Sequence, residues 1–145
     1  MNLTAHFTLE ELTASSTGAR LKINNTPSEE VVERLRQVAM KMEQVRSLLG
    51  HPLHVDSGYR CSALNTAVGG AARSAHMEGW AVDFVCMRFG SPLEIVAAII
   101  ASPIQFDQCI QEGHWVHISF APEMRRRVLT AHFGPNGTTY TEGIV

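Results

Sequence analysis

The spacing of apolar residues predicts a long amphipathic helix over residues 27–49. Apolar side chains recur there in alternating steps of four and three, at Val31, Leu35, Val38, Met42, Val45 and Leu49. This spacing places them on one face of a helix. We expect Thr26 to cap the helix, with Pro27 at its first position and Glu29 completing a capping box. Gly50 should end it. The opposite face carries both signs of charge, which indicates a helix packed on a core rather than on a membrane surface.

Local signals predict three shorter helices, over residues 7–12, over residues 62–68, and from Ser91 to the residue before Pro103. The first and third begin with capping-box pairs, Thr8 with Glu11 and Ser91 with Glu94.

Apolar and alternating runs predict four strands, over residues 53–56, 80–85, 104–111 and 115–120. The tail is rich in glycine, proline and threonine at residues 134–139, and we expect it to be a loop. The chain contains no internal repeat, linker or low-complexity segment. The sequence therefore predicts a single α+β domain over residues 1–145.

The composition excludes several classes of protein. The chain has 145 residues, a formal net charge of −2 and only 18% charged residues. It therefore lacks the clustered basic field of a general nucleic-acid-binding protein. We expect the one basic run, Arg125-Arg126-Arg127, to be a solvated surface turn. The longest strictly apolar run, residues 95–101, is too short for a membrane span. We expect a monomer with no nucleic-acid partner and no membrane insertion.

The N-terminal region does not look like a secretory signal peptide, because no Lys or Arg precedes Arg20 and no long apolar stretch occurs there. The three cysteines, Cys61, Cys86 and Cys109, fit free thiols in a reducing compartment. We therefore expect synthesis in the cytoplasm without a signal peptide.

Two of the seven histidines, together with one aspartate, suggest a metal site. Asp83 lies within the second predicted strand and His117 within the last, and each points away from the apolar face of its strand. A buried carboxylate needs a cation. If the two strands are neighbours, both side chains point into one groove, and a turn at Gly79 lets His76 approach the same carboxylate. Two imidazoles and a carboxylate suit zinc, with a fourth position left open for catalysis. Hydrogen-bonded core residues are the alternative interpretation.

Three short motifs give a resemblance to a known family. Ser-Gly-Tyr-Arg occupies residues 57–60, the pattern Ser-x-His-x-x-Gly-x-Ala-x-Asp occupies residues 74–83, and Trp-Val-His occupies residues 115–117. In this order they resemble the zinc D-Ala-D-Ala carboxypeptidase family, and more narrowly its small single-domain branch of phage lysins and murein peptidases. Residues 7–12 and 106–108 also look like that branch. The resemblance implies a hedgehog/D,D-peptidase-like fold, in which helices pack on a small, mainly antiparallel sheet. It also implies one zinc ion per chain, with the ligands His76, Asp83 and His117.

The same resemblance implies roles for further residues. Arg60 would stabilise a developing oxyanion or the substrate carbonyl, a task that a fixed guanidinium suits; a surface salt bridge is the alternative. Ser74 would help to bind substrate, or else form hydrogen bonds within its own turn. Tyr59 and Trp115 would line the substrate groove, or else pack as aromatic residues usually do. His6, His51, His54 and His132 have no expected role.

The chain departs from the family pattern at the general base. Several branches of the family carry an acidic residue three positions before the last zinc histidine, and here that position holds His114. Glu112, five positions before His117, is the other candidate. We favour Glu112, because a carboxylate can both accept and deliver the proton. His114 would then contact the oxyanion or the substrate. The conformation of the loop between the two strands decides whether Glu112 or His114 is the base.

The resemblance implies a zinc-dependent peptidase that hydrolyses D-amino-acid-containing bonds in peptidoglycan stem peptides, as a D,D-carboxypeptidase or an endopeptidase. An enzyme without a signal peptide would meet this substrate only after release, as a phage or prophage endolysin, or from within a virion. The alternative is a non-catalytic zinc-containing module of the same fold that binds peptidoglycan or a protein, as in hedgehog-type signalling domains. A pure binder has no need of Arg60 together with Glu112 or His114 beside the zinc.

Overall fold

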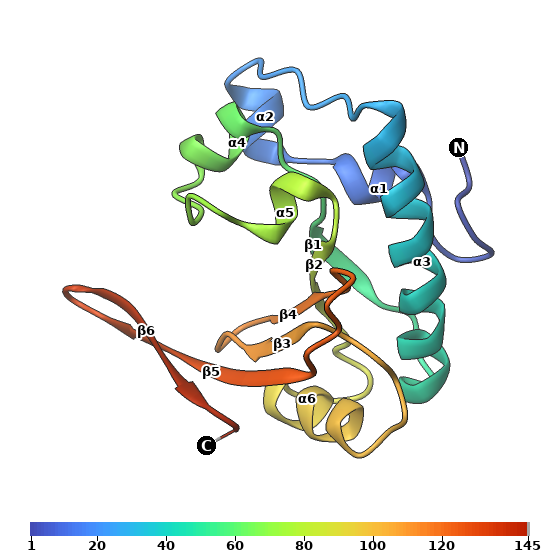
Figure 1. The fold of residues 1–145 in the computed structure, drawn as a ribbon, viewed down its shortest axis with the longest axis vertical. Helices are drawn as coiled ribbons and strands as arrows, with labels where there is room; N and C mark the ends of the chain where they lie inside the picture. Colours follow the sequence, from blue (N-terminus) through green and yellow to red (C-terminus); the bar gives the residue numbers. More distant parts are fainter. Residues whose placement is uncertain (145) are drawn as a thin grey trace.

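The computed structural model describes residues 1–144, and Figure 1 shows how its elements are arranged. In chain order they are α1 (Leu9–Thr13), α2 (Ser16–Arg20), α3 (Glu29–Leu49), β1 (His54–Ser57), α4 (Ser62–Ala67), α5 (Ala75–Glu78), β2 (Ala81–Val85), α6 (Pro92–Ile100), β3 (Gln108–Gln111), β4 (Val116–Ser119), β5 (Arg127–Gly134) and β6 (Gly137–Glu142). The predicted α+β class is confirmed. Across residues 1–144, no helix combines the length and the apolar character that a membrane crossing requires.

The six strands form one sheet in the order β1-β2-β4-β3-β5-β6. Neighbouring strands are antiparallel except for β3 and β5, which run parallel. The sheet is therefore mainly antiparallel, as expected. The two strands that were predicted to carry metal ligands, β2 and β4, are direct neighbours.

The main core lies on the face of the sheet that α3 and α6 cover (Figure 1). Fully buried apolar side chains from both helices and from the central strands meet there, among them Leu35, Val38, Met42, Ile95, Val82, Phe84 and Ile118. A second and much smaller apolar cluster comprises Ile110, Leu129 and Ala131. Ile110 is directly opposite His117 across the β3–β4 pair, so this small cluster lies on the face that carries His117.

The long helix begins later than predicted. Its N-cap is Ser28 rather than Thr26, because the Ser28 hydroxyl accepts a hydrogen bond from the backbone N–H of Val31 at 3.3 Å. Pro27 consequently precedes the cap. The end of the helix at Gly50, which has a φ of 71°, is as predicted. The capping boxes of α1 and α6 are also confirmed.

The tail is a β-hairpin and not the predicted loop. β5 and β6 pair antiparallel, and Gly134 opposite Gly137 closes the turn. Only Pro135 and Asn136 lie outside the strands. The Gly-Pro-Asn-Gly stretch is therefore a hairpin turn signal, and the threonines that follow it are good strand formers.

The basic run at residues 125–127 is exposed at Arg125 and Arg127, as expected, but it is not a free turn, because Arg127 begins β5 and all three side chains have partners. The Arg125 side chain forms two hydrogen bonds to the carboxylate of Asp107, at 2.8 and 2.9 Å, and its backbone N–H forms a third. Arg126 donates to backbone carbonyls in the α6–β3 connection, including that of Ser102 at 2.6 Å. Arg127 pairs with Glu142 of β6. β3 begins at Gln108 rather than at the predicted residue 104.

Candidate active site

Neighbouring strands place Asp83 and His117 side by side. β2 and β4 pair with these two residues directly opposite each other, so their side chains share one face of the sheet. Their sequence neighbours are buried in the main core on the other face: Val82, Phe84, Val116 and Ile118. The predicted alternation of both strands is confirmed, and it turns the two polar side chains away from the main core.

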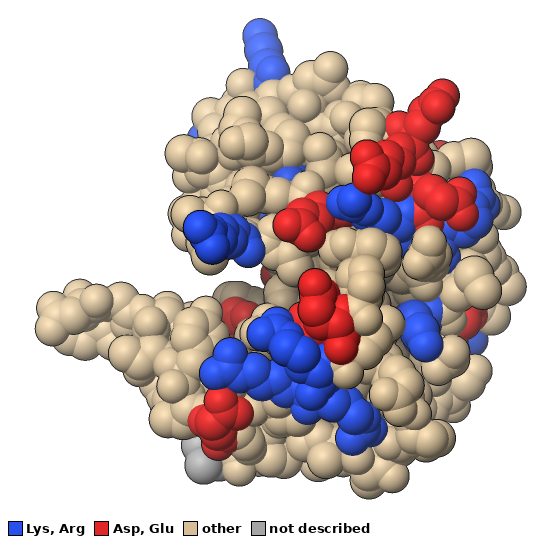
Figure 2. Space-filling view, in the orientation of Figure 1, with Lys and Arg blue, Asp and Glu red and all other residues tan. Residues whose placement is uncertain are grey.

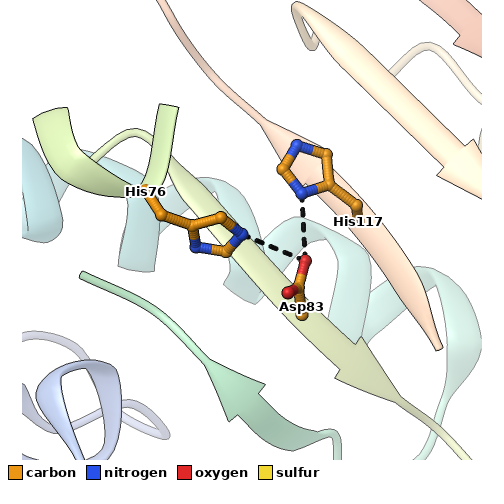
Figure 3. Close-up of side chains that lie close together, drawn as sticks. All are labelled: His76, Asp83 and His117. Atoms are coloured by element: carbon orange, nitrogen blue, oxygen red, sulfur yellow. Dashed lines mark hydrogen bonds and ion pairs between the residues drawn. The ribbon is translucent and has the colours of Figure 1, made fainter. Parts of the chain in front are cut away.

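His76 reaches this pair from the short helix α5. The Ser74 hydroxyl caps α5 by accepting a hydrogen bond from the backbone N–H of His76 at 3.2 Å. Gly79 ends α5 with a φ of 82°, a conformation that glycine adopts without strain. The chain then turns into β2, as predicted. Figure 3 shows the His76 ring pointing from α5 towards Asp83.

A backbone carbonyl fixes the orientation of the His76 ring. Nδ1 of His76 lies 2.7 Å from the carbonyl oxygen of Gly58. A carbonyl can only accept a hydrogen bond, so Nδ1 donates and Nε2 faces Asp83. Residue 58 itself packs closely against α1. Only glycine fits there, because a Cβ at position 58 would collide with the carbonyl oxygen of Leu12. The Ser-Gly-Tyr-Arg motif thus supports the histidine through its backbone.

The three side chains fit a metal ion. Their potential ligand atoms all lie within 4.8 Å of one another. Oδ1 of Asp83 lies 3.2 Å from Nε2 of His76 and 2.9 Å from Nδ1 of His117 (Figure 3). Donor atoms around a tetrahedral zinc ion lie roughly 3.4 Å apart. In the neutral ring Nε2 of His76 carries a lone pair, so it and the Asp83 carboxylate are two acceptors face to face. A cation between them satisfies both.

The local electrostatics favour the same interpretation. Burial lowers the pKa of His76, which keeps the imidazole in the neutral form that binds metals. Burial alone would raise the pKa of Asp83, but the neighbouring imidazoles of His117 and His76 hold it below its usual range. The cluster therefore combines one carboxylate and two imidazoles, a donor set that zinc accepts.

The three residues line a groove with a volume of about 630 Å³. One wall is the loop between α4 and α5, which contributes Arg73. The other wall is the β5–β6 hairpin, with Phe133 and Tyr140. Figure 2 shows the molecule hollowed between these two parts. The volume falls within the range of ligand-binding pockets in proteins.

Arg60 lines the same groove. Its two terminal nitrogens donate to the hydroxyls of Ser57 and Ser74, at 3.5 and 3.4 Å. Its Nε is buried and has no hydrogen-bond partner among residues 1–144. The guanidinium is thus held beside the metal cluster with donor capacity left over. This placement suits the expected contact with a substrate carbonyl, and the catalytic role stays a prediction.

The β3–β4 turn places Glu112 and His114 differently. Glu112 is half-buried and lines the groove, whereas His114 is exposed and is not part of the lining. Burial raises the pKa of Glu112; the charges of His117 and Arg60 oppose this rise, and the charge of Asp83 adds to it. The placement favours Glu112 over His114 as the general base, and that assignment also stays a prediction.

The three residues expected to bind substrate have different surroundings. Ser74 and Trp115 line the groove. Trp115 is half-buried, and within the described chain its indole Nε1 is covered yet lacks a hydrogen-bond partner. Tyr59 lies outside the lining and packs against the main core. Its backbone N–H donates to the carbonyl of Leu12 at 2.7 Å.

Sequence reasoning missed the hairpin wall of the groove, to which five residues contribute: Arg127, Leu129, Phe133, Thr138 and Tyr140. A signal for it was present in the sequence. Leu129, Ala131 and Phe133 alternate with less apolar residues immediately before the turn, which is the pattern of a strand with one covered face.

Comparison with known families agrees with this site. Residues 5–119 match the model of the Peptidase M15 family, and the match includes the three clustered residues. The chain belongs to the Peptidase M15 family. M15 proteins are zinc peptidases, so this chain is a metallopeptidase by family. No curated protein matches the sequence of this M15 chain. The matched region ends before β5, so the hairpin lies outside it.

Proposed function

We propose that the chain is a zinc-dependent peptidase that hydrolyses D-amino-acid-containing bonds in peptidoglycan stem peptides. The observation that supports this most directly is the cluster of His76, Asp83 and His117, which lines a groove together with Arg60 and Glu112. A zinc ion held by these three ligands would supply Lewis-acid chemistry, polarising a carbonyl and lowering the pKa of water.

The protein's own side chains would perform the remaining tasks. Arg60 would bind the substrate carbonyl and stabilise the negative charge that develops on its oxygen. Glu112 would take a proton from the attacking water and deliver it to the leaving amine. The raised pKa of Glu112 suits the first of these steps, because a carboxylate with a higher pKa accepts a proton from water more readily. Ser74 holds both α5 and Arg60 in place.

The peptidoglycan substrate rests on the resemblance of the motifs at residues 57–60, 74–83 and 115–117. We further propose that the enzyme acts on the cell wall after release, as an endolysin does, or from a virion. The groove beside the metal cluster would then decide which peptide bond of the peptidoglycan is cleaved.

Digestion of purified murein tests the proposal. The zinc-loaded protein should release soluble fragments, and their masses identify the bond that is cleaved. A chelator should stop the release, and added zinc should restore it, because the reaction requires the cation. Intact murein in every arm, combined with zinc bound at one ion per chain, would contradict the proposal and favour a non-catalytic binding module.

A further inference from the structure

The sheet face that carries the metal cluster continues as an apolar surface into the hairpin. His117 of β4 is directly opposite Ile110 of β3, and Ile110 is directly opposite Leu129 of β5. Ile110 and Leu129 are each 6% exposed and form the small cluster with Ala131. Because opposite residues share a face, an apolar strip runs from the metal cluster across β3 to β5.

Two exposed aromatic side chains extend this strip. Phe133 is 58% exposed and Tyr140 is 51% exposed, and both line the groove. Tyr140 lies opposite Ala131 in the hairpin. The Phe133 ring lies 6.2 Å from that of Trp115, which connects the hairpin to the β3–β4 turn. Grouped aromatic side chains left open to solvent beside a catalytic cluster are typical of ligand-binding surfaces.

The hairpin is fixed at its base and projects at its tip. Arg125 binds both carboxylate oxygens of Asp107 at the start of the hairpin, and Arg127 pairs with Glu142 between its two strands. β5 also pairs with β3 along Gln108 to Gln111. Figure 1 shows the two strands extending from this base beyond the rest of the sheet. Such a base holds the hairpin as a wall at a set position relative to the metal cluster.

The two walls of the groove differ in chemistry, and the difference indicates the occupant. Arg73 on the α4–α5 side lines the groove together with Arg60, whereas the hairpin side is aromatic and apolar. The Arg127 side chain on the hairpin is already paired with Glu142. An extended anionic peptide with small apolar side chains satisfies both walls, with its carboxylates towards the arginines and its methyl groups on the aromatic rings.

We propose that the β5–β6 hairpin is the specificity-determining wall of this site, and that Phe133 and Tyr140, with Trp115, hold the peptide segment of the substrate against the metal cluster. This inference rests on the proposed function and adds to it the residues that select the substrate. Since none of the three aromatic residues belongs to the ligand cluster, they would contribute to binding and not to the bond-breaking step.

The test compares two double variants of the hairpin. Phe133→Ser/Tyr140→Ser removes the aromatic surface. The control His132→Ser/Thr139→Ala changes the adjacent residues, which are paired with each other and do not line the groove. The probe is a synthetic stem pentapeptide with free carboxylates, and its binding is measured by calorimetry on zinc-loaded protein carrying Glu112→Gln. Murein digestion by the corresponding variants without Glu112→Gln gives KM and kcat.

The aromatic variant should weaken pentapeptide binding and raise KM about tenfold or more, with kcat within about twofold of the parent. Zinc content should not change, and the control should bind like the parent. Unchanged binding and KM, with murein still digested, would overturn the role of the hairpin and leave the proposed function standing. A parent protein that neither binds the pentapeptide nor digests murein would overturn both. If the double variant fails to fold, the single variants Phe133→Ser and Tyr140→Ser provide the same comparison.

Discussion

The two ends of the groove are built in opposite ways. At the metal end, His76, Asp83 and His117 are polar side chains with only 3%, 14% and 11% of their surfaces exposed. At the hairpin end, Phe133 and Tyr140 are apolar side chains that are more than half exposed. Each end thus reverses the usual distribution of residues between interior and surface.

The reversal has a different cost at each end. A buried carboxylate is tolerated only with compensating partners, so the metal end depends on every ligand at once. Exposed aromatic rings cost little in the folded protein, and each adds separately to ligand binding. Substitutions should therefore act as all-or-none changes at the metal end and as graded changes at the hairpin end.

The largest effect is expected from Asp83→Ala. Removal of the carboxylate that faces both imidazoles should abolish zinc binding and hydrolysis, and should remove the rise in Tm that zinc gives to the parent. Metal analysis and thermal unfolding with and without zinc measure this. Asp56→Ala is the matched control, because Asp56 is an exposed carboxylate of the neighbouring strand β1. Full zinc retention in Asp83→Ala would rule out the proposed ligand set.

A smaller effect is expected from Glu112→Gln, which should lower kcat about 10²- to 10⁴-fold and leave zinc content unchanged. Burial raises the pKa of Glu112, and only the ionised carboxylate acts as a base. Activity should therefore fall on acidification at a pH above the ordinary glutamate pKa of about 4.3. The residual activity of Glu112→Gln should not show this fall on acidification.

His114→Ala is the comparison for that experiment, because His114 is exposed and lies outside the groove lining. It should retain most of the activity. Loss of activity in His114→Ala with survival of Glu112→Gln would reverse the assignment of the base.

The smallest effect is expected from Asp107→Asn at the base of the hairpin. The variant loses charged hydrogen bonds to Arg125, which should lower the free energy of unfolding by about 1–2 kcal/mol. Zinc content should not change, and KM should rise modestly. Denaturant unfolding and peptide-binding measurements check this, with the exposed Glu123→Gln as the control.

The stability difference should also depend on pH. Arg125 holds the pKa of Asp107 below its usual range. The ion pair therefore contributes its full stability above the unfolded-state aspartate pKa of about 3.9, and loses it as the pH falls through the lower folded-state value. Parent and variant should converge in acid. A difference that stays constant down to strongly acidic pH would exclude this ion pair as its source.

The metal end could be predicted from sequence because its geometry follows from local rules. Side chains alternate between the two faces of a strand, which places Asp83 and His117 on the polar side of theirs. Gly79 marks the turn between His76 and the strand of Asp83, and this turn lets the His76 ring approach the carboxylate. The adjacency of β2 and β4 could not be derived in this way, because it depends on which strands pair across the sheet. The resemblance of the motifs supplied that step.

The hairpin end escaped prediction because its signals are ambiguous out of context. Gly-Pro-Asn-Gly is compatible with a loop or with a hairpin turn, and only pairing of the flanking strands decides between them. The basic run at residues 125–127 resembles a solvated turn until Asp107, far away in the sequence, supplies a partner. The start of the long helix was likewise decided by a single hydrogen bond, which the Ser28 hydroxyl accepts two residues after the predicted cap Thr26.

The direct pairing of Asp83 with His117 links the metal site to the register of the central strands. A slip of one residue between β2 and β4 would turn His117 into the helix-covered face and bring Val116 or Ile118 to the site. Tight binding of zinc by all three proposed ligands would therefore require the native register of the central strands. The ion would act as a reporter of correct assembly, and stoichiometric zinc uptake during refolding would measure the fraction of chains that have formed the native sheet.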